Sequence, residues 1–204
     1  MLDKQIEAAN NLWSDALSEW WRKSNAIISE FFQRYPHNDS KEIVTAKLAL
    51  LDKLYYAFRG SAIQLIKIAD NICKLAKHDN LDELIQKGDL KAIDLLLKEC
   101  SPIVLASKFC HFHNKSAYPI YDKYADRALK ELSIKFGIDP PKPKDYRDFK
   151  RCIDEIIALY GKRVDYETID RYLWLYGQKL EMDEGKKVSI TTKNLYKHRQ
   201  EKFK

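Results

Sequence analysis

The spacing of apolar residues restricts this chain to a helical fold. Over most of its length, apolar side chains recur every three, four or seven residues, as they do along the buried face of a helix. No stretch combines alternating apolar and polar residues with the turn signals of a hairpin. We therefore predict an all-α fold, an orthogonal array of about eight or nine helices joined by short turns.

Capping residues, glycines and prolines predict where these helices begin and end. The predicted helices cover residues 6–31, 40–58, 61–77, 81–86, 90–98, 101–113, 122–136, 145–160 and 165–180. Ser101 is expected to cap the sixth helix, with Pro102 at its first helical position. Trp13 and Trp20 are expected in the core. No internal boundary is visible, so residues 1–185 are expected to form one domain.

The composition is that of a globular protein. The chain has 204 residues, enough for one buried core, and is 45% hydrophobic and 32% charged. No apolar run approaches the ~20 residues that a membrane helix needs, and the charged N-terminus does not resemble a signal peptide. The four cysteines, Cys73, Cys100, Cys110 and Cys152, are scattered, as reduced core residues are. We expect a soluble cytoplasmic monomer that does not bind membranes.

The positive charge is concentrated in a C-terminal tail, residues 186–204. This tail holds seven Lys and Arg residues against one acid, Glu201, so the formal net charge of +6 lies there. A basic tail on a neutral body is typical of an extension that attracts phosphates. A terminus that is merely solvated would have the same composition.

Familiar catalytic signatures are absent. The sequence contains no GxGxxG, GxxxxGK[ST], HExxH or GxSxG motif. His111 and His113 are two residues apart, which points them to different sides of a helix and disfavours a shared metal ion. We predict no cofactor and no metal.

The residues best suited to chemistry are Lys108 and Asp122. Lys108 stands in the most apolar predicted helix, where desolvation favours the neutral, nucleophilic form of an amine. Asp122 stands at the start of the next helix, where backbone N–H groups stabilise a carboxylate. An amine and a fixed carboxylate suit a reaction through a cationic carbon. A solvated lysine and a simple helix cap would show the same pattern.

The run Ala106–Cys110, followed by Tyr118–Asp122, resembles the active-site segment of 8-oxoguanine DNA glycosylases, in the helix-hairpin-helix superfamily. Bacterial proteins with a similar fold also share the Ala128-Leu129 pair and the late Asp170–Trp174 run. The resemblance implies a DNA glycosylase fold with Lys108 as nucleophile and Asp122 as the assisting carboxylate. This sequence differs from the superfamily just before the helix that carries Lys108, because Glu99–Pro102 lacks the usual Gly-x-Gly turn.

A glycosylase flips a base out of double-stranded DNA and stacks it in a pocket. The residues expected to contact the base are His111, Tyr118, Trp174 and Trp21. Those expected to contact DNA phosphates are Ser101, Lys115, Lys123, Arg127, Lys197 and Arg199. The excised base, and a role in repair or in defence against phage DNA with modified bases, stay open. The alternatives are a non-catalytic helical DNA-binding protein and a helical scaffold without a nucleic-acid role.

Overall fold

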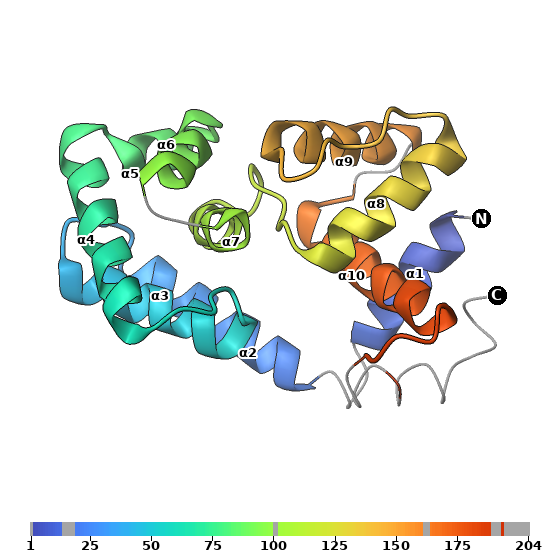
Figure 1. Ribbon diagram of the computed structural model, residues 1–204, viewed down its shortest axis with the longest axis horizontal. Helices are drawn as coiled ribbons and strands as arrows, with labels where there is room; N and C mark the ends of the chain where they lie inside the picture. The colour runs from blue at the N-terminus through green and yellow to red at the C-terminus, as the bar shows by residue number, and fades with distance from the viewer. Residues whose placement is uncertain (1, 14–18, 100–101, 161–163, 189–192, 194–204) are drawn as a thin grey trace. The chain divides into compact units, whose positions relative to one another are not determined.

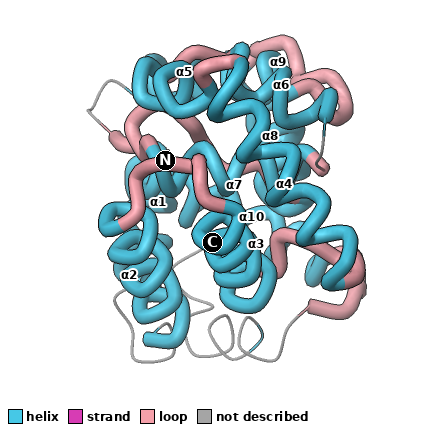
Figure 2. Tube along the Cα trace, turned by 90° about the vertical axis from the view of Figure 1, so that its left-hand side faces the viewer, coloured by secondary structure: helices cyan, strands magenta, loops and turns pink. Residues whose placement is uncertain are grey.

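The described part of the chain is helical throughout. The computed structural model describes residues 2–13, 19–99, 102–160, 164–188 and 193. Ten helices form within these ranges, and none of the described residues lies in a strand (Figures 1 and 2). The prediction of an all-α, multi-helix array is confirmed.

The chain divides into two compact units, whose positions relative to one another are not determined. The central unit is Lys23–Ile120, and the terminal unit joins Met1–Arg22 to Tyr121–Lys204. Helix α2, Glu19–Arg34, begins in the terminal unit and continues into the central unit. The predicted single domain over residues 1–185 stays a prediction.

The central unit contains five further helices. They are α3 (Lys41–Tyr55), α4 (Ala62–His78), α5 (Leu81–Lys87), α6 (Lys91–Glu99) and α7 (Ile103–His113). Helix α7 packs against α3, α5 and α6, and Figure 1 shows it end-on with α3 and α6 on either side. Every residue of α7 from Leu105 to Phe112 is buried. A helix that is apolar on all sides is stable only when it is enclosed in this way.

Most predicted helix boundaries are confirmed by their capping bonds. Ser61 and Gln64 form a capping box at the start of α4, and Gly137 ends α8 (Lys123–Phe136) in the left-handed conformation. Asp165 accepts from the backbone N–H of Thr168 at the start of α10 (Tyr166–Asp183). These boundaries were predictable because each depends on a few neighbouring residues.

Two local predictions, for Trp20 and Pro102, were wrong. Of the predicted helix over 6–31, the structure describes α1 (Leu2–Trp13) and α2, and residues 14–18 between them lie outside the described residues. Trp20, in the first turn of α2 and four residues before the buried Ser24, is 46% exposed rather than in the core. Pro102 occupies the capping position of α7 with extended backbone, and the helix begins one residue later.

The terminal unit is built on α10, which packs against α1 and α8, while α9 (Tyr146–Tyr160) packs on α8. Gly177 allows α8 and α10 to approach closely. A Cβ atom placed on Gly177 would overlap the backbone carbonyl of Tyr124, which a rotamer change cannot move away.

Gly177→Ala is therefore expected to lower the free energy of unfolding by about 2 kcal/mol or more, the usual scale for overpacking. Gly185→Ala is the matched control, because Gly185 has a φ of +73° but no atom within 4 Å of the added Cβ. It should cost only about 1 kcal/mol of backbone strain. Urea denaturation of both variants tests this, and equal losses would contradict a close contact at Gly177.

A buried polar cluster ties the C-terminal end of α7 to the rest of the central unit. Lys47 has no exposed surface, and its Nζ donates to the carbonyl of His37 at 3.0 Å and to Oδ1 of Asn38 at 2.8 Å. His113 Nε2 lies 3.4 Å from the same amine. Asn38 in turn donates to the carboxylate of Asp82. Burial lowers the pKa of Lys47 to about 8, although the carboxylates of Asp82 and Asp39 raise it.

The same cluster predicts a loss of stability in acid. Burial first, and then the charge of Lys47, holds the pKa of His113 well below its usual 6.5. Below pH ~6.5 the unfolded chain takes up a proton that the folded chain does not, so stability falls by up to about 1.4 kcal/mol per pH unit. Well above pH ~6.5 His113 is neutral in both the folded and the unfolded chain, so its protonation no longer changes the free energy of unfolding.

Urea denaturation between pH 7.5 and 5.5 measures this slope. His113→Gln should flatten it, whereas His78→Gln, at an exposed histidine, should leave it unchanged. A slope that survives in His113→Gln would show that other groups cause the acid sensitivity.

Candidate functional site

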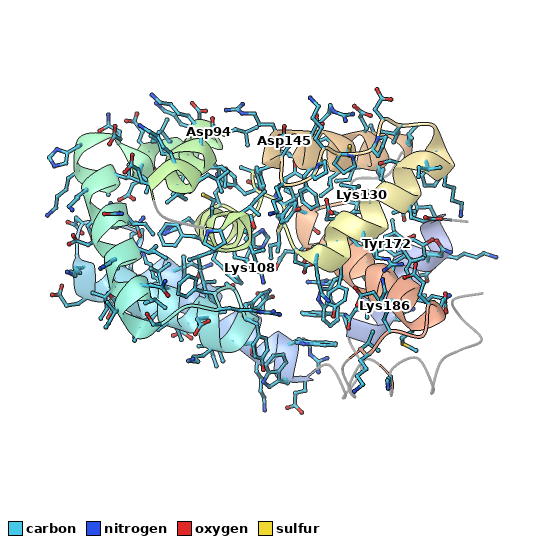
Figure 3. The ribbon with its side chains drawn as sticks, viewed as in Figure 1. Asp94, Lys108, Lys130, Asp145, Tyr172 and Lys186 are labelled. Carbon is cyan, nitrogen blue, oxygen red and sulfur yellow. The ribbon has the colours of Figure 1, made fainter. Side chains whose placement is uncertain are left out.

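Lys108 is buried in the central unit with its amine held in a defined position. The side chain is 5% exposed, and Nζ donates to the backbone carbonyl of Tyr55, at the end of α3, at 2.8 Å. Nζ also lies 5.3 Å from the centre of the Tyr55 ring, a cation–π distance. Figure 3 labels Lys108, which belongs to α7. The expected burial of this lysine is confirmed, and the amine does not reach out as a solvated side chain.

Tyr55, which contacts the lysine, and Asn25, which contacts Tyr55, were not identified as site residues from the sequence. The Tyr55 ring packs edge-on against Phe112, one turn after Lys108, with ring centres 5.3 Å apart. Its hydroxyl accepts from Nδ2 of Asn25 at 3.1 Å. Tyr55 is 53 positions away from Lys108 in the chain. No local pattern links residues that far apart, and only the packing of α3 on α7 brings them together.

Asp122 is the N-cap of α8, in the terminal unit. Its Oδ1 accepts from the backbone N–H groups of Tyr124 and Ala125, both at 2.8 Å. Two such donors stabilise the ionised carboxylate and fix its direction. The predicted cap is therefore confirmed. Since Lys108 belongs to the other unit, the structure describes two halves of the predicted site and does not give the distance between them.

His111 and Tyr118 bind one another inside the central unit. His111 Nδ1 lies 2.7 Å from the carbonyl of Tyr118, and His111 is 1% exposed. Tyr118 has no exposed surface, and its hydroxyl donates to the carbonyl of Asp89 at 2.9 Å. Burial raises the pKa of the Tyr118 phenol. A ring enclosed in this way cannot stack on a base, so Tyr118 is better explained as a packing residue.

Trp21 and Trp174 meet in the terminal unit. Their rings pack edge to face with centres 4.6 Å apart, and Trp21 also lies parallel to Trp13 at 5.9 Å. Tyr124, two residues after Asp122, contacts the Trp174 ring edge-on at 6.2 Å. Trp13, Trp21 and Trp174 are all partly exposed. The two tryptophans predicted separately thus form one aromatic cluster, and Tyr124, which contacts it, lies two residues after the Asp122 cap.

The predicted phosphate-binding cations already have protein partners. Lys115 donates to Oδ1 of Asn25 at 3.1 Å. Lys123 lies 3.4 Å from a carboxylate oxygen of Glu181, and Arg127 forms an ion pair with Glu184. Phosphates would compete with these two glutamates for the cations. Ser101, Lys197 and Arg199 lie outside the described residues.

Neither a metal cluster nor a spanning helix is found in the described part of the chain. Within it, no group of three or more His, Cys, Asp and Glu residues is arranged to hold a metal ion. None of its helices is both long enough and apolar enough to cross a membrane.

Comparison with known proteins places the first half of the chain in a family. The HI_0787 N-terminal domain family matches residues 1–117. The chain belongs to this family. The matched residues include Lys108 and His111 and end before Asp122 and Trp174.

One relative is a protein of Haemophilus influenzae described as uncharacterized, 27% identical over 120 residues. The aligned region is 52% of this chain and 57% of the relative. No solved structure matches the chain.

Proposed function

We propose that this protein is a DNA glycosylase that acts as a monomer on double-stranded DNA, with Lys108 as its nucleophile. The observation that supports it best is the amine of Lys108, buried on α7 and oriented by the Tyr55 carbonyl. Lysines are almost never fully buried unless they are paired, and here the partner is the Tyr55 carbonyl. The catalytic role is the one implied by the resemblance of Ala106–Cys110 and Tyr118–Asp122 to 8-oxoguanine DNA glycosylases.

In the proposed reaction the Lys108 nitrogen gives its lone pair to C1′ of an extruded nucleotide. The bond from C1′ to the base breaks, and the base leaves with the bonding electrons and takes up a proton. Asp122 stabilises the positive charge that develops on the sugar. A Schiff base with the opened sugar follows, and β-elimination can then cut the strand. The reaction requires Lys108 and Asp122 to reach the same nucleotide when DNA is bound.

The aromatic cluster of Trp13, Trp21 and Trp174 offers partly exposed rings on which a flipped base can stack. Oxidised purines are the substrates that the resemblance implies, and modified bases of phage DNA are the alternative. Cys73, Cys110 and Cys152 are free thiols, which supports a reducing compartment such as the cytoplasm. Incubation with duplexes that carry each candidate base, followed by detection of the free base, tests the proposal.

A non-catalytic DNA-binding protein is the second candidate. It is favoured by the hydrogen bond that already occupies the Lys108 amine and by the basic tail over residues 186–204. Such a protein would bind duplex DNA in a salt-dependent manner and release no base from any duplex.

Lys108→Gln is expected to abolish base release while the melting temperature and DNA affinity change little, because glutamine keeps a side chain of similar length without a nucleophilic amine. Lys98→Gln is the control, at an exposed lysine on α6 of the same unit, and it should leave base release unchanged. Single-turnover base release is the measurement. Release at the parental rate by Lys108→Gln would remove this residue from the mechanism.

Asp122→Asn separates a catalytic carboxylate from a helix cap. Asparagine caps about as well as aspartate, so thermal stability should change by less than about 1 kcal/mol. Loss of the negative charge should lower single-turnover base release by ~100-fold or more.

Asp165→Asn is the control for this comparison, since Asp165 caps α10 through the same kind of bond, at 2.8 Å. It should change neither property. If both variants release base at the parental rate, Asp122 is only a cap.

A further inference from the structure

The loop that holds the Lys108 amine also presents an aromatic side chain to solvent. Helix α3 ends at Tyr55, whose carbonyl accepts from Lys108, and the next residue, Tyr56, is 72% exposed. Consecutive Cα atoms are about 3.8 Å apart. The exposed ring of Tyr56 is thus attached to the backbone one residue from the contact with the candidate nucleophile.

The rest of this loop, residues 56–61, is anchored. The N–H groups of Tyr56 and Ala57 both donate to the carbonyl of Leu51, and Ala57 is buried. The Phe58 ring lies over Gly60, where it would overlap a Cβ atom placed on that glycine. Ser61 begins α4 with its capping box. Tyr56 is therefore presented from a fixed base rather than from a loose segment.

The backbone at Tyr56 is strained for its residue type. Its φ of 50° and ψ of 40° are left-handed, in the position where helices commonly end with glycine. A residue with a Cβ atom loses about 1–2 kcal/mol there. Strain of this kind tends to persist where a side chain is needed for function. The sequence prediction, which extended the helix to 58, missed this feature.

The charge around the loop is positive. Residues 53–69 contain Lys53, Arg59 and Lys67 and no acidic residue. Arg59 and Lys67 are exposed, and neither forms an ion pair with any residue that the structure describes. An exposed aromatic ring followed in sequence by two cations that form no ion pair within the described residues is complementary to bases and phosphates.

We propose that the 56–61 loop contacts duplex DNA, with Tyr56 stacked in the gap left by the extruded nucleotide and Arg59 and Lys67 on the phosphates. The inference rests on the proposed function, because C1′ of that nucleotide has to lie within reach of the Lys108 amine. The gap in the duplex is then next to the Tyr55 carbonyl. Tyr56 is the exposed aromatic residue adjacent to it in sequence.

The test uses the full-length protein and a duplex that carries a tetrahydrofuran abasic site beside 2-aminopurine, whose fluorescence falls when an aromatic ring stacks on it. Tyr56→Gly should not lower the melting temperature, because glycine relieves the left-handed strain. It should lose the fluorescence decrease that the parent protein causes and about tenfold or more in affinity, as expected for one stacked ring. Tyr56→Trp should restore both.

Two further comparisons complete the test. Ile134→Ala, at a side chain that is 71% exposed on α8, should leave binding unchanged. Arg59→Ala and Lys67→Ala should each reduce the salt dependence of binding by about one phosphate contact. Unaltered fluorescence and affinity in Tyr56→Gly would overturn the proposal, as would tighter binding to single-stranded DNA than to the abasic duplex.

Base release by the parent protein is measured in parallel, so that the two proposals can fail separately. Loss of the fluorescence decrease in Tyr56→Gly, without base release by the parent on any duplex, supports the proposed loop contact and refutes the glycosylase. If Tyr56→Gly releases base at the parental rate, the glycosylase proposal stands and the proposed contact between the 56–61 loop and DNA is refuted.

Discussion

Enclosure of α7 is the constraint on which the central unit depends. This helix is buried from Leu105 to Phe112, so its neighbours α3, α5 and α6 have to cover its sides. Two lysines are enclosed with them, and each is satisfied differently. Lys47 lies among the oxygens of His37 and Asn38, next to His113 at the end of α7. Lys108 lies against the Tyr55 carbonyl. Buried amines need such partners, because an amine left without them is costly.

The same packing determines where the Lys108 amine lies, and the proposed reaction depends on that position. The Tyr55 carbonyl and ring hold the amine in one direction, and Asn25 holds the Tyr55 hydroxyl. An oriented amine loses little freedom when it attacks, which is the main benefit of preorganisation. It also has to leave the Tyr55 carbonyl to do so. The 56–61 loop follows the Tyr55 carbonyl directly. DNA that contacts this loop would therefore lie next to the hydrogen bond between Tyr55 and the Lys108 amine.

The features that the sequence predicted well are local ones. The Asp122 cap and the capping box at Ser61 need only three or four neighbouring residues, and the burial of α7 follows from its composition. The features that it missed depend on tertiary packing. Tyr55 meets Lys108 across 53 residues, and Trp20 is exposed in the first turn of α2 although it lies four residues before the buried Ser24. Tyr118 was likewise predicted to contact the base because of the motif in which it stands, but the motif does not show that its ring is fully buried.

Covalent trapping tests the role of Lys108 most directly. The protein is incubated with duplexes that carry oxidised purines or modified phage bases, reduced with borohydride, and digested for peptide mass spectrometry. We predict a sugar-derived adduct on Lys108, reduced from the Schiff base, on at least one duplex. An adduct on another amine, or base release without any adduct on Lys108, would contradict its role as the nucleophile.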